Sequence, residues 1–559
     1  MLHIYTGKLK PEFIAKAAQT FSRYKGEMSA FRDKVRENDK WYKCNYGTLI
    51  KPGTNEPGPA TAFIANAIFN RYADFIDNYP VPNILERMPD YSGAAAKLRE
   101  IIPVILNVTG FKSVYKRNCY NKMKNGAGIY GVFYNEETEN IEITAVDIMD
   151  FFCDIRVRNI QESQFIFVRN AVDNEFLREK YPQNADLFSG GCTVEGREGN
   201  YSLPDRTEVL DCYYKKTDGT VHMMKLVGES VVIDATEDIP GYEGGLYAHG
   251  KYPFVIDTMY PDDDNIMGFS LIDITRNPQM YIDKLDAAIL RNAMLSSHPR
   301  WLIKDNGGIS KREFTDMKNE VISSAADVDE KNIRMFQVNS LPAFVREHRT
   351  KKIEELKEIS GNRDWNSGGT MGGVTAASAI EALQNTGQKL SRANIDDTYE
   401  SYKCIIYMVI ELIREFFNKK SVYRVTDESG HKSFIEFSNE EMYSTENDIF
   451  GEKKHRKAEF DVSVVPQKEN PFTSETNNQT INRLWQLGYF QPQNMELSIM
   501  ALRCMSFDSR DKLVEMMQEY LDTHGTQNTE AVNEEPKPGE GVVAIPVGDA
   551  SYLGGDVNG

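Results

Sequence analysis

The stretch GNRDWNSGGTMGGVTAASAIEALQ, residues 361–384, separates two predicted helices of very different character. Five of residues 361–373 are glycine, a density that neither a helix nor a strand tolerates. A heavily charged helix is predicted before it, over residues 343–360, and a very long helix after it, over residues 376–417. At 1.5 Å per residue the second helix would extend roughly 60 Å. The glycine-rich segment is therefore a joint between long helices.

Two interpretations of this joint remain open from its composition alone: a passive hinge and a functional loop. It is not a phosphate-binding loop, because it lacks the G-x-x-x-x-G-K-[ST] spacing and joins two helices rather than following a strand. Trp365 is one of only four tryptophans in the chain, and Arg363 lies beside it. An aromatic ring and a cation at a flexible tip favour a functional loop.

The charged helix over residues 343–360 has few apolar residues, and they form a thin stripe. Such a stripe suits packing against one neighbouring helix, with the other faces in water or against another subunit. A salt-bridged, solvent-exposed helix is the plainer interpretation of its mixed charge.

Upstream of the charged helix, the pattern predicts a strand over residues 251–256, a turn over 261–265 and a helix from residue 268 to about 297. Pro278 predicts a kink in that helix or a late start near Asn277. Over residues 299–341 the pattern predicts a compact, small α/β insert.

The remaining periodicity predicts an α+β fold, mainly helical, with mostly antiparallel strands. Helical patterns cover residues 11–35, 60–76, 93–108 (kinked at Pro103) and 474–520. Strand patterns cover residues 128–134, 141–146, 164–169, 208–214, 221–226, 421–426, 432–437 and 458–465. From residue 524 the chain carries six acidic residues, one lysine and repeated proline and glycine, a composition typical of disorder.

Composition narrows the function classes. The formal charge is −18, so a protein that wraps DNA through a basic surface is excluded, although nucleic acid held at a few points is not. No apolar stretch approaches the roughly 20 residues of a membrane span. The seven cysteines include no C-x-x-C pair, which indicates reduced thiols rather than disulfides or a zinc site.

An enzymatic alternative rests on Asp262, Asp263 and Asp264, whose carboxylates could bind a divalent cation in a metal-dependent phosphoryl hydrolase. A solvated turn that caps the next helix is the more common role of such a sequence. The eight histidines include no H-E-x-x-H motif and no pair three or four residues apart. A non-catalytic adaptor is a further alternative.

The succession of these elements resembles the portal proteins of tailed bacteriophages, from about Trp41 to Tyr520. The strongest local matches are residues 251–255 and the segment AASAIEALQ, residues 376–384, preceded by the glycine-rich loop. The segments over residues 484–489 and 501–513 are similar to the crown helices of that family.

The resemblance implies a subunit divided into wing, stem, clip and crown. The wing would comprise residues 1–262, followed by a first stem helix (263–298), the clip (299–341) and a second stem helix (342–360). A tunnel loop (361–375), a long wing helix with wing strands (376–466), crown helices (467–523) and a disordered acidic tail (524–559) would complete the chain. The residues of the tunnel loop that would face DNA are Arg363, Trp365, Asn366, Thr370 and Met371. The stem charges that would line the channel or a subunit interface are Arg346, Arg349, Lys351, Lys352, Glu354 and Lys357.

The resemblance also implies a structural role without catalysis, cofactor or metal. Members form a homododecameric ring at a unique capsid vertex of the virion, the channel for genome packaging and ejection. The implied partners are double-stranded DNA, the terminase large subunit, the head–tail adaptor, and the major capsid and scaffolding proteins, with no membrane. Assembly would take place in the host cytoplasm.

Overall fold

The computed structural model describes most of the chain, in segments. They are residues 7–46, 60–228, 231–242, 244–297, 300–303, 333–336, 341–361, 389–426, 432–447, 453–467, 481–489, 495–503, 513–514 and 516–518. The chain divides into two compact units, Met1–Gln467 and Lys468–Gly559. Helices and strands are both abundant, so the fold is α+β.

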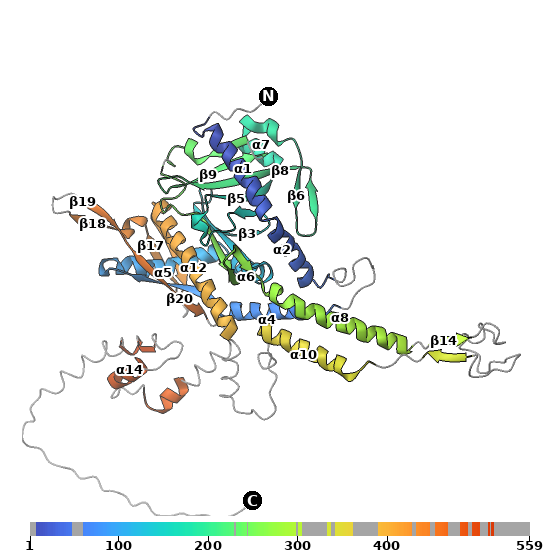
Figure 1. Ribbon diagram of the computed structural model, residues 1–559. Helices are drawn as coiled ribbons and strands as arrows, with labels where there is room; N and C mark the ends of the chain where they lie inside the picture. Colours follow the sequence, from blue (N-terminus) through green and yellow to red (C-terminus); the bar gives the residue numbers. More distant parts are fainter. Residues whose placement is uncertain are drawn as a thin grey trace, which may run out of the picture. The chain divides into compact units, whose positions relative to one another are not determined.

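The first unit begins with two helices, and the first of them packs on a five-stranded antiparallel sheet (Figure 1). The helices are α1 (Pro11–Glu27) and α2 (Ser29–Tyr42). The sheet has the order β10-β9-β8-β5-β4, with bounds Val231–Ala235, Val221–Val227, Arg206–Lys215, Phe165–Asp173 and Phe151–Cys153. Phe21 and Tyr24 of α1 pack against Phe152 and Phe167 of the sheet, which closes one hydrophobic core.

A second, larger core lies between four helices and two small sheets. The helices are α4 (Phe63–Asp77), α5 (Ser92–Val108), α6 (Phe111–Asn125) and α12 (Lys389–Phe416). One sheet has the order β11-β2-β3, with bounds Phe254–Thr258, Ala127–Asn135 and Asn140–Val146, and the other pairs β1 (Tyr79–Glu86) with β20 (Phe460–Gln467). Since β1 pairs with β20, the beginning and the end of this unit close on one core.

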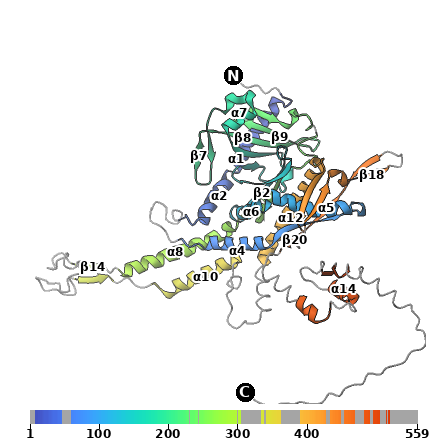
Figure 2. The same cartoon turned by 180° about the vertical axis from the view of Figure 1, so that it is seen from behind.

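Two long helices leave this core side by side (Figures 1 and 2). They are α8 (Leu271–Ser297) and α10 (Ala343–Ser360), and between them in the chain lies the hairpin of β14 (Arg300–Ile303) and β15 (Ile333–Phe336). The chain therefore runs outward along α8, turns through the β14–β15 region and returns along α10.

The first unit also contains further β-hairpins. They are β6–β7 (Cys192–Glu195 and Asn200–Leu203), β12–β13 (Tyr260–Asp262 and Asn265–Phe269), β16–β17 (Ser421–Thr426 and Lys432–Phe437) and β18–β19 (Tyr443–Asn447 and Lys453–Lys457). A short helix, α7 (Asn174–Lys180), follows β5.

The second unit contains helix α14 (Met495–Arg503) and a helical turn over residues 481–486. Its small core consists of Leu484, Ile499, Leu502, Val514 and Met517. The predicted tail, residues 524–559, lies outside the described residues. Within the described part of the chain, no helix has both the length and the apolar character needed to cross a membrane.

Most predicted elements that fall on described residues are confirmed, with differences in their bounds. The helical pattern over residues 11–35 belongs to two helices, because the backbone bends at the buried Met28 (φ −83°, ψ −3°). Helix α8 begins at Leu271, so Pro278 does not delay its start to Asn277. Pro278 is accommodated within the buried half of α8.

Candidate functional site

The helix pair α8–α10 differs from the rest of the described chain because the two helices extend away from the main core (Figure 1). A charge pair joins the two helices: the guanidinium of Arg349 on α10 binds both carboxylate oxygens of Asp286 on α8, with Nη2–Oδ2 at 3.0 Å. This bidentate contact raises the pKa of Arg349. Leu356 is the buried apolar residue of α10, at 2% exposure, and lies one turn from the helix end. The Arg349–Asp286 ion pair therefore joins the two helices, and Leu356 gives α10 a buried apolar residue near its end.

The start of α8 is fixed by a reciprocal cap. The Ser270 hydroxyl accepts a hydrogen bond from the backbone N–H of Asp273, and the Asp273 carboxylate accepts from the backbone N–H and the hydroxyl of Ser270, both at 2.8 Å. Asp273 also pairs with Lys34 of α2 at 3.0 Å. This cap explains why the helix starts at Leu271 although a proline follows seven residues later.

One buried carboxylate anchors α8 to the body. Asp283 is fully buried and accepts hydrogen bonds from the Tyr46 hydroxyl (2.6 Å), from the N–H and hydroxyl of Thr61 (3.1 and 2.8 Å) and from the Gln279 amide (3.0 Å). Burial and the nearby Asp283 carboxylate raise the pKa of Tyr46, which keeps its hydroxyl protonated as a donor. Asp283 thus ties two distant parts of the chain to the middle of α8.

Beyond this anchor, α8 exposes large apolar side chains. Leu290 is 55% exposed and Met294 is 61% exposed, and Phe344 at the facing end of α10 is 66% exposed. The same helix buries one face over its first half, where Leu271, Ile272 and Ile282 have no exposed surface. Exposed apolar groups clustered at one end of a helix pair indicate a surface that another protein surface covers.

The predicted stem charges fall into two groups. Arg349 pairs with Asp286, and Lys352 pairs with Glu355 within α10 at 2.6 Å. Arg346, Lys351 and Glu354 are exposed, and Lys357 is half-buried. The sequence did not reveal Asp283, Asp286, Tyr46 or Thr61, since these residues are brought together only by the tertiary fold. The Ser270-x-x-Asp273 pattern, in contrast, could have been recognised as a helix start.

The predicted DNA-facing residues of the loop lie outside the described residues: Arg363, Trp365, Asn366, Thr370 and Met371. Residues 376–388 of the predicted long helix also lie outside them. The structure describes both flanks. Gly361 ends α10 in the left-handed conformation (φ +71°), which glycine adopts without strain. On the other side, α12 is described from Lys389.

Buried polar contacts fix the start of α12. Ser391 lies between Arg71 and Asp74 of α4 and hydrogen-bonds to both. Two turns further along α12, the ammonium group of Lys122 (α6) lies 2.6 Å from Asp257 Oδ1 (β11) and 2.6 Å from the Thr398 hydroxyl of α12. Lys122 has no exposed surface and Asp257 only 2%. The helix that leads out of the loop region is therefore clamped to the body from its first turns.

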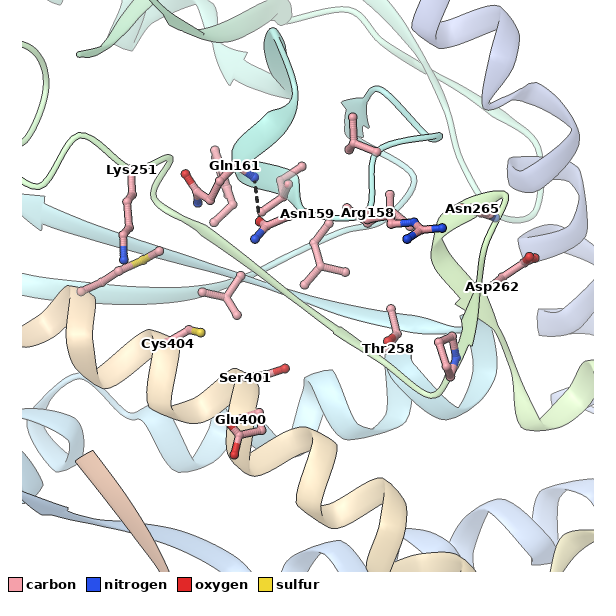
Figure 3. A pocket seen from close by; sticks show the side chains of 18 of the residues that line it. Arg158, Asn159, Gln161, Lys251, Thr258, Asp262, Asn265, Glu400, Ser401 and Cys404 are labelled. Carbon is pink, nitrogen blue, oxygen red and sulfur yellow. Dashed lines mark hydrogen bonds between the residues drawn. The ribbon is translucent and has the colours of Figure 1, made fainter. Parts of the chain in front are cut away.

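A cavity of about 940 Å³ lies beside α12 (Figure 3). Glu400, Ser401 and Cys404 contribute from α12, and Arg158 and Asn159 from the loop after β4. Burial raises the pKa of the Cys404 thiol, so the thiol is not an activated nucleophile. No histidine is among the described residues that line it. Asp262 and Asp263 of the enzymatic alternative also line this cavity.

The aspartates of the enzymatic alternative lie at the turn of the β12–β13 hairpin. Asp262, Asp263 and Asp264 are exposed, and the Asp262 carboxylate accepts the backbone N–H of Asp264 at 3.2 Å. The turn does not cap α8, since Ser270 and Asp273 do. In the segments that the structure describes, no group of three or more His, Cys, Asp or Glu side chains is arranged to hold a metal ion.

Comparison with known protein families gives a match over most of the chain. The model of the "Phage P22-like portal protein" family matches residues 74–541, which includes every element of the α8–α10 pair, the glycine-rich segment and α12. The chain belongs to the P22-like phage portal protein family. No curated protein matches the chain.

Family membership assigns this portal protein its role in the phage particle. Portal proteins are structural components of the capsid vertex, so the role of this chain is structural. The predicted portal resemblance is therefore confirmed, and the described residues include no cluster of three or more His, Cys, Asp or Glu side chains for the metal of the hydrolase alternative.

Proposed function

We propose that twelve copies of this portal protein form a ring at a unique capsid vertex, the channel through which the genome is packaged and ejected. The observation that carries the proposal is the exposed apolar end of the α8–α10 pair, at Leu290, Met294 and Phe344. In a single chain these groups face water, whereas in a closed ring each pair has a neighbour on both sides that can cover them.

The proposed subunit has the parts implied by the family. Residues 1–262 and 376–466 form the wing, 263–298 and 342–360 the stem helices, and 299–341 the clip. Residues 361–375 form the tunnel loop, 467–523 the crown and 524–559 an acidic tail. The clamps on α12 and the anchor at Asp283 support this division, because they fix the helix that follows the loop and the first stem helix to the same body.

Charge supports a channel that DNA can slide through. The chain is acidic overall, which disfavours tight binding of phosphates, while a few cations in the loop or stem would touch the duplex. During assembly in the host cytoplasm, the ring would meet the capsid and scaffolding proteins. The clip would then dock the terminase large subunit and later the head–tail adaptor.

The first test replaces the exposed apolar residues of α8 in the variant L290Q/M294Q. Burying a side chain of this size contributes about 1.5–3 kcal/mol, and the loss recurs at every interface of the ring. We expect native mass measurements to show dissociation of the variant at concentrations where the wild type is a ring. The matched control is V108Q/F176Q, at apolar residues that are 70% and 53% exposed elsewhere on the surface.

Intact L290Q/M294Q rings with wild-type stability to dilution would overturn the proposed interface.

A second test deletes residues 361–375. We expect rings to form and to lose packaging or retention of DNA, and loss of ring assembly would count against the tunnel-loop assignment.

A further inference from the structure

The β18–β19 hairpin carries the densest positive charge of the described chain. Strand β19 consists of five consecutive basic residues, Lys453, Lys454, His455, Arg456 and Lys457. It pairs with β18 alone, with Lys457 opposite Tyr443 and Lys454 opposite Glu446. Four of the five residues are cationic at neutral pH in a chain whose net charge is −18. This concentration of charge is opposite to the character of the whole molecule.

The base of the hairpin is fixed in the main core. Met442 and Ala458, which flank the two strands, are 0% and 1% exposed, and the Ala458 N–H donates to the Met442 carbonyl at 3.0 Å. Arg414 of α12 donates to the Ala458 carbonyl at 2.5 Å. Figures 1 and 2 show the ribbon extending outward from the β16–β17 and β20 region of the same unit. A firmly held base presents the basic strand at a fixed place on the body.

We infer that the β18–β19 ribbon binds the phosphate backbone of double-stranded DNA, separately from the channel contacts. The inference rests on the proposed function only in that a portal protein handles duplex DNA. Four residue steps of a strand span about 13 Å at 3.3 Å each. Duplex DNA presents one phosphate per about 1.7 Å of its axis, so about eight phosphates lie along the length of β19.

The geometry of a two-stranded ribbon also suits a duplex, because the major groove is about 12 Å wide and admits such a ribbon. The sequence offers no side chain set typical of base reading here, so the contact is to phosphates and independent of DNA sequence. Lysine on an edge strand also discourages strand-to-strand aggregation. If protection against aggregation were the whole role of these lysines, the ribbon would not bind DNA in a salt-dependent way.

The test measures binding of a fluorescent 30-base-pair duplex to the full chain between 50 and 200 mM salt. The logarithm of the binding constant falls by about 0.9 per phosphate contact for each tenfold rise in salt. Successive residues of a strand lie on opposite faces, so residues 453 and 457 share one face of β19 and residues 454 and 456 share the other. A duplex against one face therefore meets two cations, and the variant K453Q/K454Q/R456Q/K457Q should flatten the slope by about 1.8, a change of about 12-fold in affinity over this fourfold salt range. Of the double variants K453Q/K457Q and K454Q/R456Q, one should reproduce this loss and the other should keep the wild-type slope.

The matched control is K10Q/K16Q/K40Q/R156Q, which removes four exposed cations and gives the same net charge. Its slope should stay within about one unit of the wild type. A quadruple ribbon variant with the wild-type slope overturns the inference. Electron microscopy of the same samples separates the two proposals: rings with an unchanged slope refute the ribbon contact alone, whereas absence of rings in the wild type refutes the proposed function.

Discussion

Replacement of Lys122 by methionine tests the clamp that holds the long helix α12 to the body. The ammonium group has no exposed surface and contacts the Asp257 carboxylate and the Thr398 hydroxyl, each at 2.6 Å. Methionine fills the space but leaves Asp257 buried without its cation. Breaking a buried ion pair from one side costs about 3–5 kcal/mol.

The assay is hydrogen exchange of the α12 amides in the full chain. A loss of 3–5 kcal/mol in the local unfolding free energy corresponds to exchange about 150- to 5,000-fold faster, at 1.36 kcal/mol per tenfold. Burial raises the pKa of Asp257 and Lys122 lowers it, so in K122M the pKa rises further. A raised pKa means that the folded state holds a proton that the unfolded state releases, so the loss grows as the pH rises above the ordinary range of aspartate.

Two control variants separate the effect of the broken buried ion pair from the effect of removing a lysine. K122M/D257L replaces the pair by apolar side chains and should return exchange to within about tenfold of the wild type. K403M removes the surface pair of Lys403 with Glu400 on the same helix and should change exchange by no more than about twofold. If K122M exchanges like K403M, the clamp does not hold α12.

Three further predictions concern the helix pair and one histidine. R349A leaves Asp286 without its partner and should lower the thermal midpoint of the ring by several degrees, whereas the exposed K351A should leave it unchanged, and equal midpoints would contradict the pairing. D283N removes the carboxylate that holds Tyr46 and Thr61, so amide exchange at residues 60–62 should accelerate at least tenfold, and protection equal to the wild type would count against the anchor. Burial lowers the pKa of His249 to about 4, and its Nδ1 accepts the Lys251 N–H, so the neutral form is the folded one and stability falls as the pH drops from about 6.5 toward 4. H249Q should lose less thermal stability than the wild type over that interval, and parallel melting curves would show that His249 makes no contribution.

The elements visible in the sequence are those with strong local signals. The strands at residues 421–426 and 432–437 are found at the predicted bounds, because β-branched and aromatic residues alternate between clear turns. Helix α6 and strand β1 were not anticipated. β1 contains Pro80 and Pro82 and is tolerated as a strand because it pairs on one side only, with β20, nearly 400 residues away.

The candidate site was predictable in outline and not in its contacts. The glycine-rich segment and the thin apolar stripe of α10 indicate a helix pair that needs a neighbour. The Asp283 anchor joins residues more than 200 positions apart, so no local pattern could reveal it. Helix α8 shows the same limit: its proline is visible in the sequence, but the burial that accommodates it depends on tertiary packing.

Imaging of the purified full chain by electron microscopy, together with its native mass, tests the central claim most directly. We expect a ring with an open centre, a mass of about 763 kDa for twelve copies of the 63.6 kDa chain, and the α8–α10 pairs around the opening. A stable, folded monomer of 63.6 kDa, or a closed particle without an opening, would contradict it.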